Sequence, residues 1–220
     1  MQFKVPLLYK DLTLGQLMIL ETETSMLKRV AACANIDIDQ LRKLSQQEVM
    51  HADIHLSKIK DMETGKHKPV IELGGKQYGF IPDWNAFTLG EWIDMENYCE
   101  DFWANAHKIA ALLYRPIERK QGDVYTIAKY TAKEDAEAFK ELPADLFAGC
   151  MLFFSTTRKE LQRTIRQSLI QVVEKQTNLQ SDGAGTVYST PLLTRILQRW
   201  TKLVRLLQGL FSRTLPISKT

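Results

Sequence analysis

The spacing of hydrophobic residues up to position 61 has the three-to-four-residue period of amphipathic helices. Thr13 lies three residues before Gln16, the spacing at which a threonine caps a first helical turn and a glutamine reaches back to the cap. Breaks at Asn35 and Ser45 separate further helical pieces. The pattern predicts a short strand over 2–8 and helices over 14–23, 26–34, 37–44 and 46–61.

The hydrophobic period changes at Pro69. Apolar residues follow a strand-like pattern in VIEL and QYGFI, on either side of Gly74 and Gly75. Because glycine takes the positive φ that tight hairpin turns need, we expect a β-hairpin within 69–82 that turns at these two residues.

A second capping signal occurs at Thr88, where FTLGEW echoes LTLGQL at 12–17 and Glu91 takes the place of Gln16. It predicts a helix over 89–99. The rest of the chain is expected to form a helix over 102–114 that stops at Arg115-Pro116, a strand over 123–130, a helix over 132–142, and a long helix over 144–177 that begins apolar all round and therefore buried.

Together these elements predict an α+β fold that is mainly α with a small β-hairpin. The segment NLQSDGAGTVYS carries glycine and serine without hydrophobic periodicity, as linkers do. The expected organisation is a helical domain over 1–177, a linker over 178–190, a basic amphipathic helix over 191–213 and a tail over 214–220.

The basic helix carries a stripe of large apolar residues at alternating three- and four-residue spacing. The stripe consists of Leu193, Ile196, Trp200, Leu203, Leu207 and Leu210, and basic residues that fall mostly away from it include Arg195, Arg199, Lys202 and Arg205. Three interpretations remain open. The helix packs on its own domain, on another copy or another protein, or on an anionic membrane surface.

Charge is distributed unevenly along the 220 residues, whose net charge is +3. From 191 onward there are six basic residues and no acidic one, whereas 77–107 has six acidic residues and no Lys or Arg. This asymmetry favours an interaction protein over a nucleic-acid-binding one, which would spread positive charge over its domain. We therefore predict that Glu91, Asp94 and Glu96 belong to a surface that accepts the basic helix.

An enzymatic interpretation rests on the region 84–101, where carboxylates stand among aromatic residues. The carboxylates are Glu91, Asp94 and Glu96, and the nearby tryptophans are Trp84, Trp92 and Trp103. Acidic residues in the first turns of a helix are also favoured by the helix dipole, by about 0.3–1 kcal/mol each, and tryptophans are common in cores. No GxSxG motif occurs and no histidine lies near a cysteine in sequence. No catalytic residue is assigned, and an enzyme remains the outside alternative.

A metal-site interpretation rests on Glu48, His51 and His55, which share one face of a predicted helix. A di-iron bundle needs a second ExxH motif, and zinc needs further ligands that the widely spaced cysteines do not supply. These are expected to be surface histidines, so no metal and no cofactor is predicted. Gly74-Gly75-Lys76 lacks the spacing of a phosphate-binding loop.

Localisation is predicted from the cysteines and the apolar runs. The three cysteines make no disulfide framework. The N-terminus has no signal-peptide pattern, and the most apolar run, 146–154, is about half the roughly 20 residues of a membrane span. A reducing cytosol is expected, and a membrane partner is not.

Three strings give the chain a resemblance to a known family: YGFIPD at 78–83, TLGEWIDME at 88–96 and LYRPI at 113–117. With the opening FKVP and DLTLGQ, they resemble a family of small tailed-bacteriophage proteins, the tail-assembly chaperones or virion-associated proteins. The resemblance covers roughly residues 1–155 and excludes the basic helix. It carries no catalytic motif.

The resemblance implies a non-enzymatic role in particle assembly, through contacts with other phage structural proteins or further copies of the chain. A tail-assembly chaperone would bind a client and leave, whereas a virion component would stay as a ring, connector, collar or baseplate subunit. The expected location is the cytoplasm of the bacterial host during assembly, or the virion itself. The sequence does not separate these two alternatives.

Overall fold

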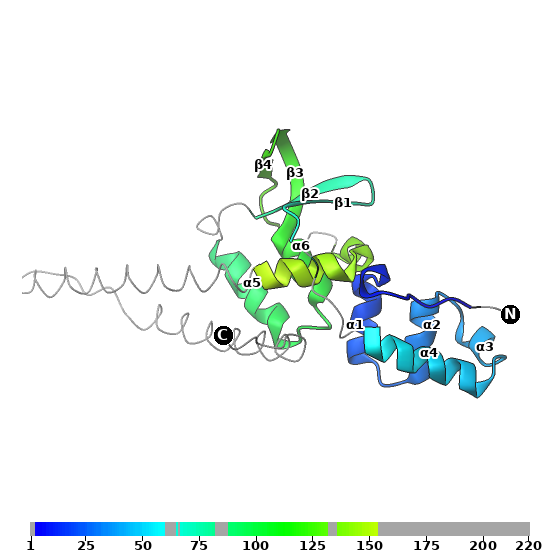
Figure 1. The fold of residues 1–220 in the computed structure, drawn as a ribbon. Helices are drawn as coiled ribbons and strands as arrows, with labels where there is room; N and C mark the ends of the chain where they lie inside the picture. Colours follow the sequence, from blue (N-terminus) through cyan, green and yellow to red (C-terminus); the bar gives the residue numbers. More distant parts are fainter. Residues whose placement is uncertain (1–2, 60–64, 66, 82–87, 132–135, 154–220) are drawn as a thin grey trace, which may run out of the picture. The chain divides into compact units, whose positions relative to one another are not determined.

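The structure is a computed structural model that describes residues 3–59, 65, 67–81, 88–131 and 136–153. The chain divides into two compact units, 1–150 and 151–220, and of the second only 151–153 are described. The first unit combines helices with a four-stranded antiparallel sheet, which confirms the α+β class (Figure 1). The predicted linker over 178–190, the basic helix over 191–213 and the tail over 214–220 lie outside the described residues.

The N-terminal part of the first unit is helical, as predicted. After a 3-10 turn, η1 (Tyr9–Asp11), come α1 (Leu14–Thr22), α2 (Met26–Ala34), the short α3 (Ile38–Leu41) and α4 (Gln46–Ile59). Asn35 ends α2 with a left-handed φ of 52°, a conformation that asparagine tolerates.

The strand predicted over 2–8 is wrong for the part that is described, since residues 3–8 pair with no strand. Phe3 and Val5 pack against the helical core instead. The Pro6 carbonyl lies 3.1 Å from His55 Nε2 of α4, so side-chain packing on the helices replaces strand pairing.

The helical core is a cluster of buried side chains drawn mostly from these helices, with Leu12 before α1 and Ala144 from the later part of the chain. Arg29 of α2 also pairs with both carboxylate oxygens of Asp53 on α4, with Nε donating to Oδ1 at 2.8 Å. The core cluster consists of Leu12, Leu17, Leu20, Val30, Ala31, Cys33, Leu41, Val49, Ala52, Leu56, Ile59 and Ala144.

The sheet has the order β1 (Val70–Leu73), β2 (Lys76–Phe80), β3 (Tyr114–Gln121) and β4 (Val124–Ile127). The predicted hairpin is confirmed by the pairing of β1 with β2. Gly74 and Gly75 form its turn with φ of 56° and 73°, values that non-glycine residues rarely adopt.

The helix predicted over 102–114 is shorter, and its continuation is a strand. It starts later, as α6 (Ala106–Leu113), and the chain passes directly into β3, where Tyr114 pairs with Phe80 and Pro116 with Tyr78. The buried Tyr114 hydroxyl donates to the Lys68 carbonyl at 2.7 Å. Arg115-Pro116 therefore lies within a strand, because pairing with β2 continues the ordered chain past the helix.

The strand predicted over 123–130 is confirmed for Val124–Ile127, and it folds against β2. The β3–β4 register shifts between Ile117 and Arg119, and bulges of this kind bend a strand. Tyr125 then lies directly over Gly79, where an added Cβ would come within 2.4 Å of its ring. Its hydroxyl donates to the Phe80 carbonyl at 2.8 Å.

Two distant segments pair beside α1 in what we call the clasp, residues 12–14 and 142–144. Leu14 N donates to the Leu142 carbonyl at 2.7 Å, and Ala144 N donates to the Leu12 carbonyl at 2.9 Å. The clasp follows η3 (Glu137–Glu141), a 3-10 helix where an α-helix over 132–142 was predicted, and leads into a helix over 144–153. The described part of the predicted 144–177 helix is thus confirmed, with Phe147 and Cys150 buried.

Candidate functional site

The region singled out by the acidic sequence is α5 (Leu89–Glu100), and its start is built as predicted. Thr88 Oγ1 accepts a hydrogen bond from Glu91 N at 3.3 Å, and a Glu91 carboxylate oxygen accepts from Thr88 N. This is the reciprocal cap that Thr13 and Gln16 form at the start of α1. The similar sequences at 12–17 and 87–92 therefore form the same local structure.

Glu91 also forms a buried ion pair. Its Oε1 lies 2.8 Å from Arg115 Nη2, and the two side chains are 1% and 9% exposed. Neither Glu91 Oε1 nor Arg115 Nε has a hydrogen-bond partner among the described residues, so the contact is electrostatic. Arg115 Nη1 donates to the Ala128 carbonyl at 3.3 Å, which ties the start of α5 to β3 and to the chain after β4.

Glu91 therefore does not belong to an accessible acidic surface, and that part of the prediction is corrected. Asp94 is half-buried and accepts a hydrogen bond from the Tyr130 hydroxyl at 2.6 Å. Burial, followed by hydrogen bonds with Asp94 and Tyr98, raises the pKa of Tyr130. Of the three predicted carboxylates, Glu91 and Asp94 thus hold structural contacts, and Glu96 is half-buried.

The outward side of α5 is nevertheless acidic. We define the α5 face as Ile93, Glu96, Asn97 and Glu100 together with Asp101 at the helix end; Ile93 is 49% exposed, and Asn97, Glu100 and Asp101 are exposed. Glu100 and Asp101 form no ion pair with any described residue. Lys108, which follows on α6, is held by Asn105 Oδ1 at 3.0 Å and lies over the Tyr98 ring.

The tryptophans of the acidic region are Trp84, Trp92 and Trp103. Trp103 packs against the helical core and meets the Phe102 ring edge-on, with centroids 5.0 Å apart. These contacts favour a role for Trp103 in packing over a role in catalysis. Trp84 lies outside the described residues, as does the side chain of Trp92.

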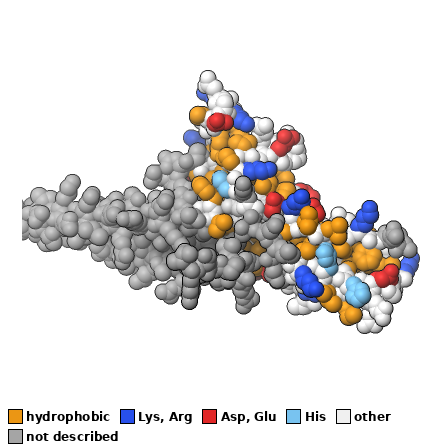
Figure 2. Space-filling view, viewed as in Figure 1, with side chains coloured by type: hydrophobic (Ala, Val, Ile, Leu, Met, Phe, Trp, Pro, Cys, Tyr) orange, Lys and Arg blue, Asp and Glu red, His pale blue; other side chains and the backbone are white. Residues whose placement is uncertain are grey.

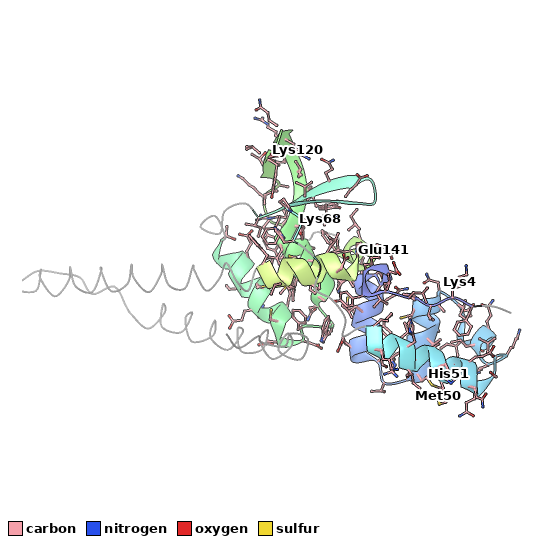
Figure 3. The ribbon with its side chains drawn as sticks, viewed as in Figure 1. Lys4, Met50, His51, Lys68, Lys120 and Glu141 are labelled. Atoms are coloured by element: carbon pink, nitrogen blue, oxygen red, sulfur yellow. The ribbon has the colours of Figure 1, made fainter. Side chains whose placement is uncertain are left out.

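The side chains considered for a metal site do not meet at one point; these are Glu48, His51 and His55. Glu48 accepts from Ser45 Oγ at 2.7 Å in a helix cap, and this contact lowers the pKa of the carboxyl. His55 is held at Pro6, and His51 points outward from α4 beside Met50 (Figure 3). In the described part of the chain, no three His, Cys, Asp or Glu side chains are close enough to hold a metal ion. The absence of a bound metal stays a prediction.

The three cysteines are free and buried. Burial raises the pKa of Cys33 to about 12, and it also raises the pKa of Cys150. A thiol with such a pKa is not ionised near neutral pH and is a poor nucleophile. Cys33 and Cys150 are therefore poorly suited to act as catalytic nucleophiles.

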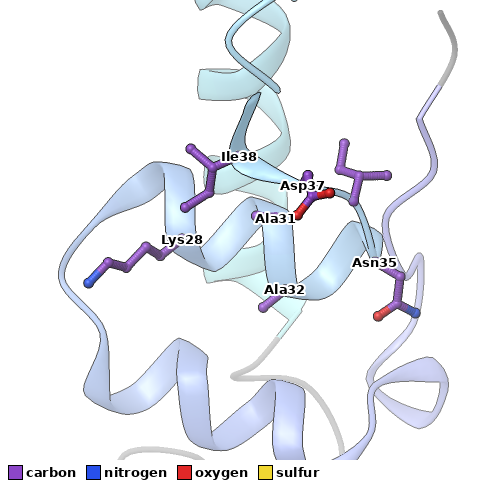
Figure 4. Close-up of a pocket in the computed structure, with 7 residues that line it drawn as sticks. Lys28, Ala31, Ala32, Asn35, Asp37 and Ile38 are labelled. Atoms are coloured by element: carbon purple, nitrogen blue, oxygen red, sulfur yellow. The ribbon is translucent and has the colours of Figure 1, made fainter. Parts of the chain in front are cut away.

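Two surface features were not predicted from the sequence. Hydrophobic side chains lie on the surface over α4, where Met50 and Ile54 are 42% and 45% exposed one turn apart (Figure 2). A hollow beside α2 is lined by Ala31, Ala32 and Ile38 between Lys28 and Asp37 (Figure 4). Within the hollow, Lys28 pairs with Glu23 at 3.1 Å.

None of the described helices has both the length and the apolar character needed to cross a membrane. The apolar stripe and basic residues predicted to bind a partner, Leu193 to Leu210, lie outside the described residues. Comparisons with family models, with curated proteins and with solved structures find no match to the chain.

Proposed function

We propose that this chain is a non-enzymatic assembly protein of a bacteriophage particle that acts through protein contacts, as a tail-assembly chaperone. The observation that carries the proposal is the opposite charge of the sequence 191–213 and the α5 face. The sequence 191–213 combines a stripe of large apolar residues with an excess of basic ones, and the α5 face is acidic with one exposed apolar residue.

The contacts of the acidic side chains support a binding role over catalysis. The carboxylates proposed for an acid–base mechanism are Glu91, Asp94 and Glu96. Glu91 is held by a helix cap and an ion pair, Asp94 accepts a hydrogen bond from Tyr130, and Glu96 is half-buried. A general acid or base must reach a substrate proton. Glu91, at 1% exposed, is out of reach.

The free energy of burying apolar side chains supports the same role for the C-terminal stripe. Six large apolar side chains stabilise a buried state by about 1.5–3 kcal/mol each, so a stripe of this length requires a covering surface. Charge between the basic sequence and the α5 face would set the orientation and rate of docking more than its strength. A second copy or a client protein supplies the contact under this proposal.

The first test separates binding in trans from packing within the chain. We expect the full-length double variant Trp200→Asp, Leu207→Asp to lose association measured by light scattering while its unfolding midpoint stays unchanged. The matched control is Gln198→Asp, Gln208→Asp, which adds the same charge away from the stripe. Unchanged association, or a lower midpoint with unchanged mass, would contradict the proposal.

The second test separates the chaperone from a virion component. Mass spectrometry of purified virions should not detect the chain at stoichiometric level, although infected cells contain it. Stoichiometric presence in the particle would reject the chaperone and leave the structural role that the sequence also allowed.

A further inference from the structure

The outward side of α4 has exposed apolar side chains in its middle and exposed charges of opposite sign at its two ends. We call it the α4 face and define it by the exposed residues Gln47, Glu48, Met50, His51, Ile54 and Lys58. Met50 and Ile54 are about half exposed and lie one turn apart on the same side of the helix, so they form one apolar surface. Met50 points outward beside His51 (Figure 3). Adjacent apolar side chains of this kind gain free energy when a partner covers them.

The charges of the α4 face are separated along the helix. Glu48 stands in the first turn of α4 and Lys58 in the last. The remaining acidic residue of α4 is Asp53, which is paired with Arg29. Glu48 uses Oε2 for both hydrogen bonds that it accepts from Ser45, so its Oε1 takes no part in that cap. The α4 face therefore has a negative end, an uncharged apolar middle and a positive end.

A second copy of the chain fits this charge pattern when the two α4 helices run antiparallel. A two-fold axis at the level of Ala52 places Met50 opposite the partner's Ile54. With a rise of about 1.5 Å per residue, Glu48 then lies within about 3 Å of the partner's Lys58 along the helix axis. The two Glu48 residues are about 12 Å apart along the axis and the two Lys58 residues about 18 Å, distances at which salt screens most of the repulsion between exposed charges. Opposite charges are thus adjacent in this arrangement, and like charges are not.

We propose that the α4 face docks on the α4 face of a second copy of this chain, in an antiparallel two-fold contact. A parallel pair is disfavoured because it would set Glu48 beside Glu48 and Lys58 beside Lys58. Packed helices have axes about 8–10 Å apart, which lets Met50 and Ile54 meet across the contact.

The size of the α4 face sets the strength of this contact. With two large apolar side chains from each copy, the contact belongs to the weak class of interfaces that bury less than about 1,200 Å². The dimer therefore forms at high protein concentration. It does not rest on the proposed docking of the sequence 191–213, which uses a different surface.

Sedimentation velocity of the full-length protein tests the contact. The Trp200→Asp, Leu207→Asp variant removes the proposed C-terminal association and leaves the α4 face unchanged. This variant should dimerise reversibly at protein concentrations up to about 0.5 mM. Adding Met50→Gln with Ile54→Gln should weaken the dimer at least about tenfold, whereas adding Val124→Gln, at an exposed apolar position of β4, should leave it unchanged. A chain that stays monomeric over this range, or a dimer that the two α4 substitutions leave intact, would overturn the proposal.

A charge exchange in the same background tests the antiparallel register. Glu48→Lys and Lys58→Glu should each weaken the dimer at low salt, because each sets like charges together. An equimolar mixture of the two should dimerise more tightly than either alone, because both contacts of the mixed dimer again join opposite charges. The control mixture is Glu118→Lys with Lys120→Glu, at exposed positions of β3, and it should show no such gain. A dimer that Lys58→Glu does not weaken would overturn the antiparallel contact even if Glu48→Lys, which alters the cap, does not fold.

Discussion

α1 and α5 begin in the same way and are completed differently. Each starts with a threonine cap followed by Leu-Gly, and each has a residue three positions on that reaches back to the cap. In α1 that residue is the neutral Gln16, and in α5 it is the acidic Glu91. The difference lies in what each side chain meets beyond the cap.

The surroundings of Gln16 call for a hydrogen-bond donor, and those of Glu91 call for a negative charge. Gln16 Nε2 lies 3.3 Å from the carbonyl oxygens of both Ala32 and Cys33, near the end of α2. Glu91 instead faces the guanidinium of Arg115. One local motif therefore serves two tertiary environments, and the third residue after the cap is matched to its neighbour.

The two helices also differ at their C-terminal ends, where the helix dipole disfavours acidic groups. Glu23, at the end of α1, accepts from Ser25 N at 3.0 Å and pairs with Lys28, contacts that lower the pKa of its carboxyl. Glu100 and Asp101, at the end of α5, have no such cation among the described residues. α1 is neutralised within the chain, whereas α5 presents its charge outward.

The largest expected effect comes from removing the cation behind α5. Arg115→Met leaves the buried Glu91 carboxylate uncompensated, which costs about 3–5 kcal/mol when one partner of a buried pair is lost. The free energy of unfolding in urea should fall by that amount. Arg119→Met, on the exposed part of the same strand, should stay within about 0.5 kcal/mol of wild type.

The double variant Glu91→Gln, Arg115→Met sharpens this result. It gives α5 the neutral cap of α1, and replacing both partners of a buried pair is often close to neutral. Most of the lost stability should return. A double variant as unstable as Arg115→Met alone would show that Arg115 acts through packing and not through Glu91.

The reverse exchange in α1 should have the next largest effect. Gln16→Glu keeps the cap acceptor but removes the donor to Ala32 and Cys33, and it turns a negative charge toward their carbonyls. Leaving such groups unsatisfied costs about 1–3 kcal/mol, measured by urea unfolding. Gln47→Glu, on the exposed surface of α4, is the matched control and should change stability little. A neutral result for Gln16→Glu would mean that these carbonyls need no partner.

Removing the cap hydroxyls should cost less, and about equally in both helices. Thr13→Ala and Thr88→Ala each lose the acceptor for one first-turn N–H, typically about 1 kcal/mol. Thr13→Ser and Thr88→Ser keep the hydroxyl and should retain most of the stability. A much larger loss for Thr88→Ala would indicate that the cap also positions Glu91 for Arg115, and would break the equivalence of the two motifs.

The sequence was sufficient for features that depend on neighbouring residues. Both threonine caps, the Gly74-Gly75 turn and most helix positions follow from local chemistry, and they are confirmed. The prediction at Pro116 was incomplete. A proline near a helix end indicates that the helix stops, but here Pro116 lies in β3 and pairs with Tyr78 of β2. Strand pairing between distant segments outweighed the local signal.

The contacts of the candidate site could not be predicted from neighbouring residues, because they also join distant segments. The partners Glu91 and Arg115 are far apart in sequence, and so are Asp94 and Tyr130, so spacing alone cannot show that these carboxylates are engaged. The clasp does have a signal in the sequence, because FKEL at 139–142 is similar to YKDL at 9–12. A search for that repeat would have indicated that η1 and η3 are equivalent.

The smallest expected effect per substitution concerns Glu100 and Asp101 at the end of α5, which form no ion pair with a described residue. Glu100→Gln with Asp101→Asn removes two negative charges from the negative end of a helix dipole, so the full-length protein should become slightly more stable, by about 0.3–1 kcal/mol per charge at low salt. The same variant should associate more weakly in light scattering if these acids receive the basic sequence 191–213. Glu21→Gln with Glu23→Gln in α1 is the matched control. It removes two charges of which Glu23 is already paired with Lys28, so it should not weaken association. Equal effects of the two variants on association would show that total charge, and not the α5 face, governs docking.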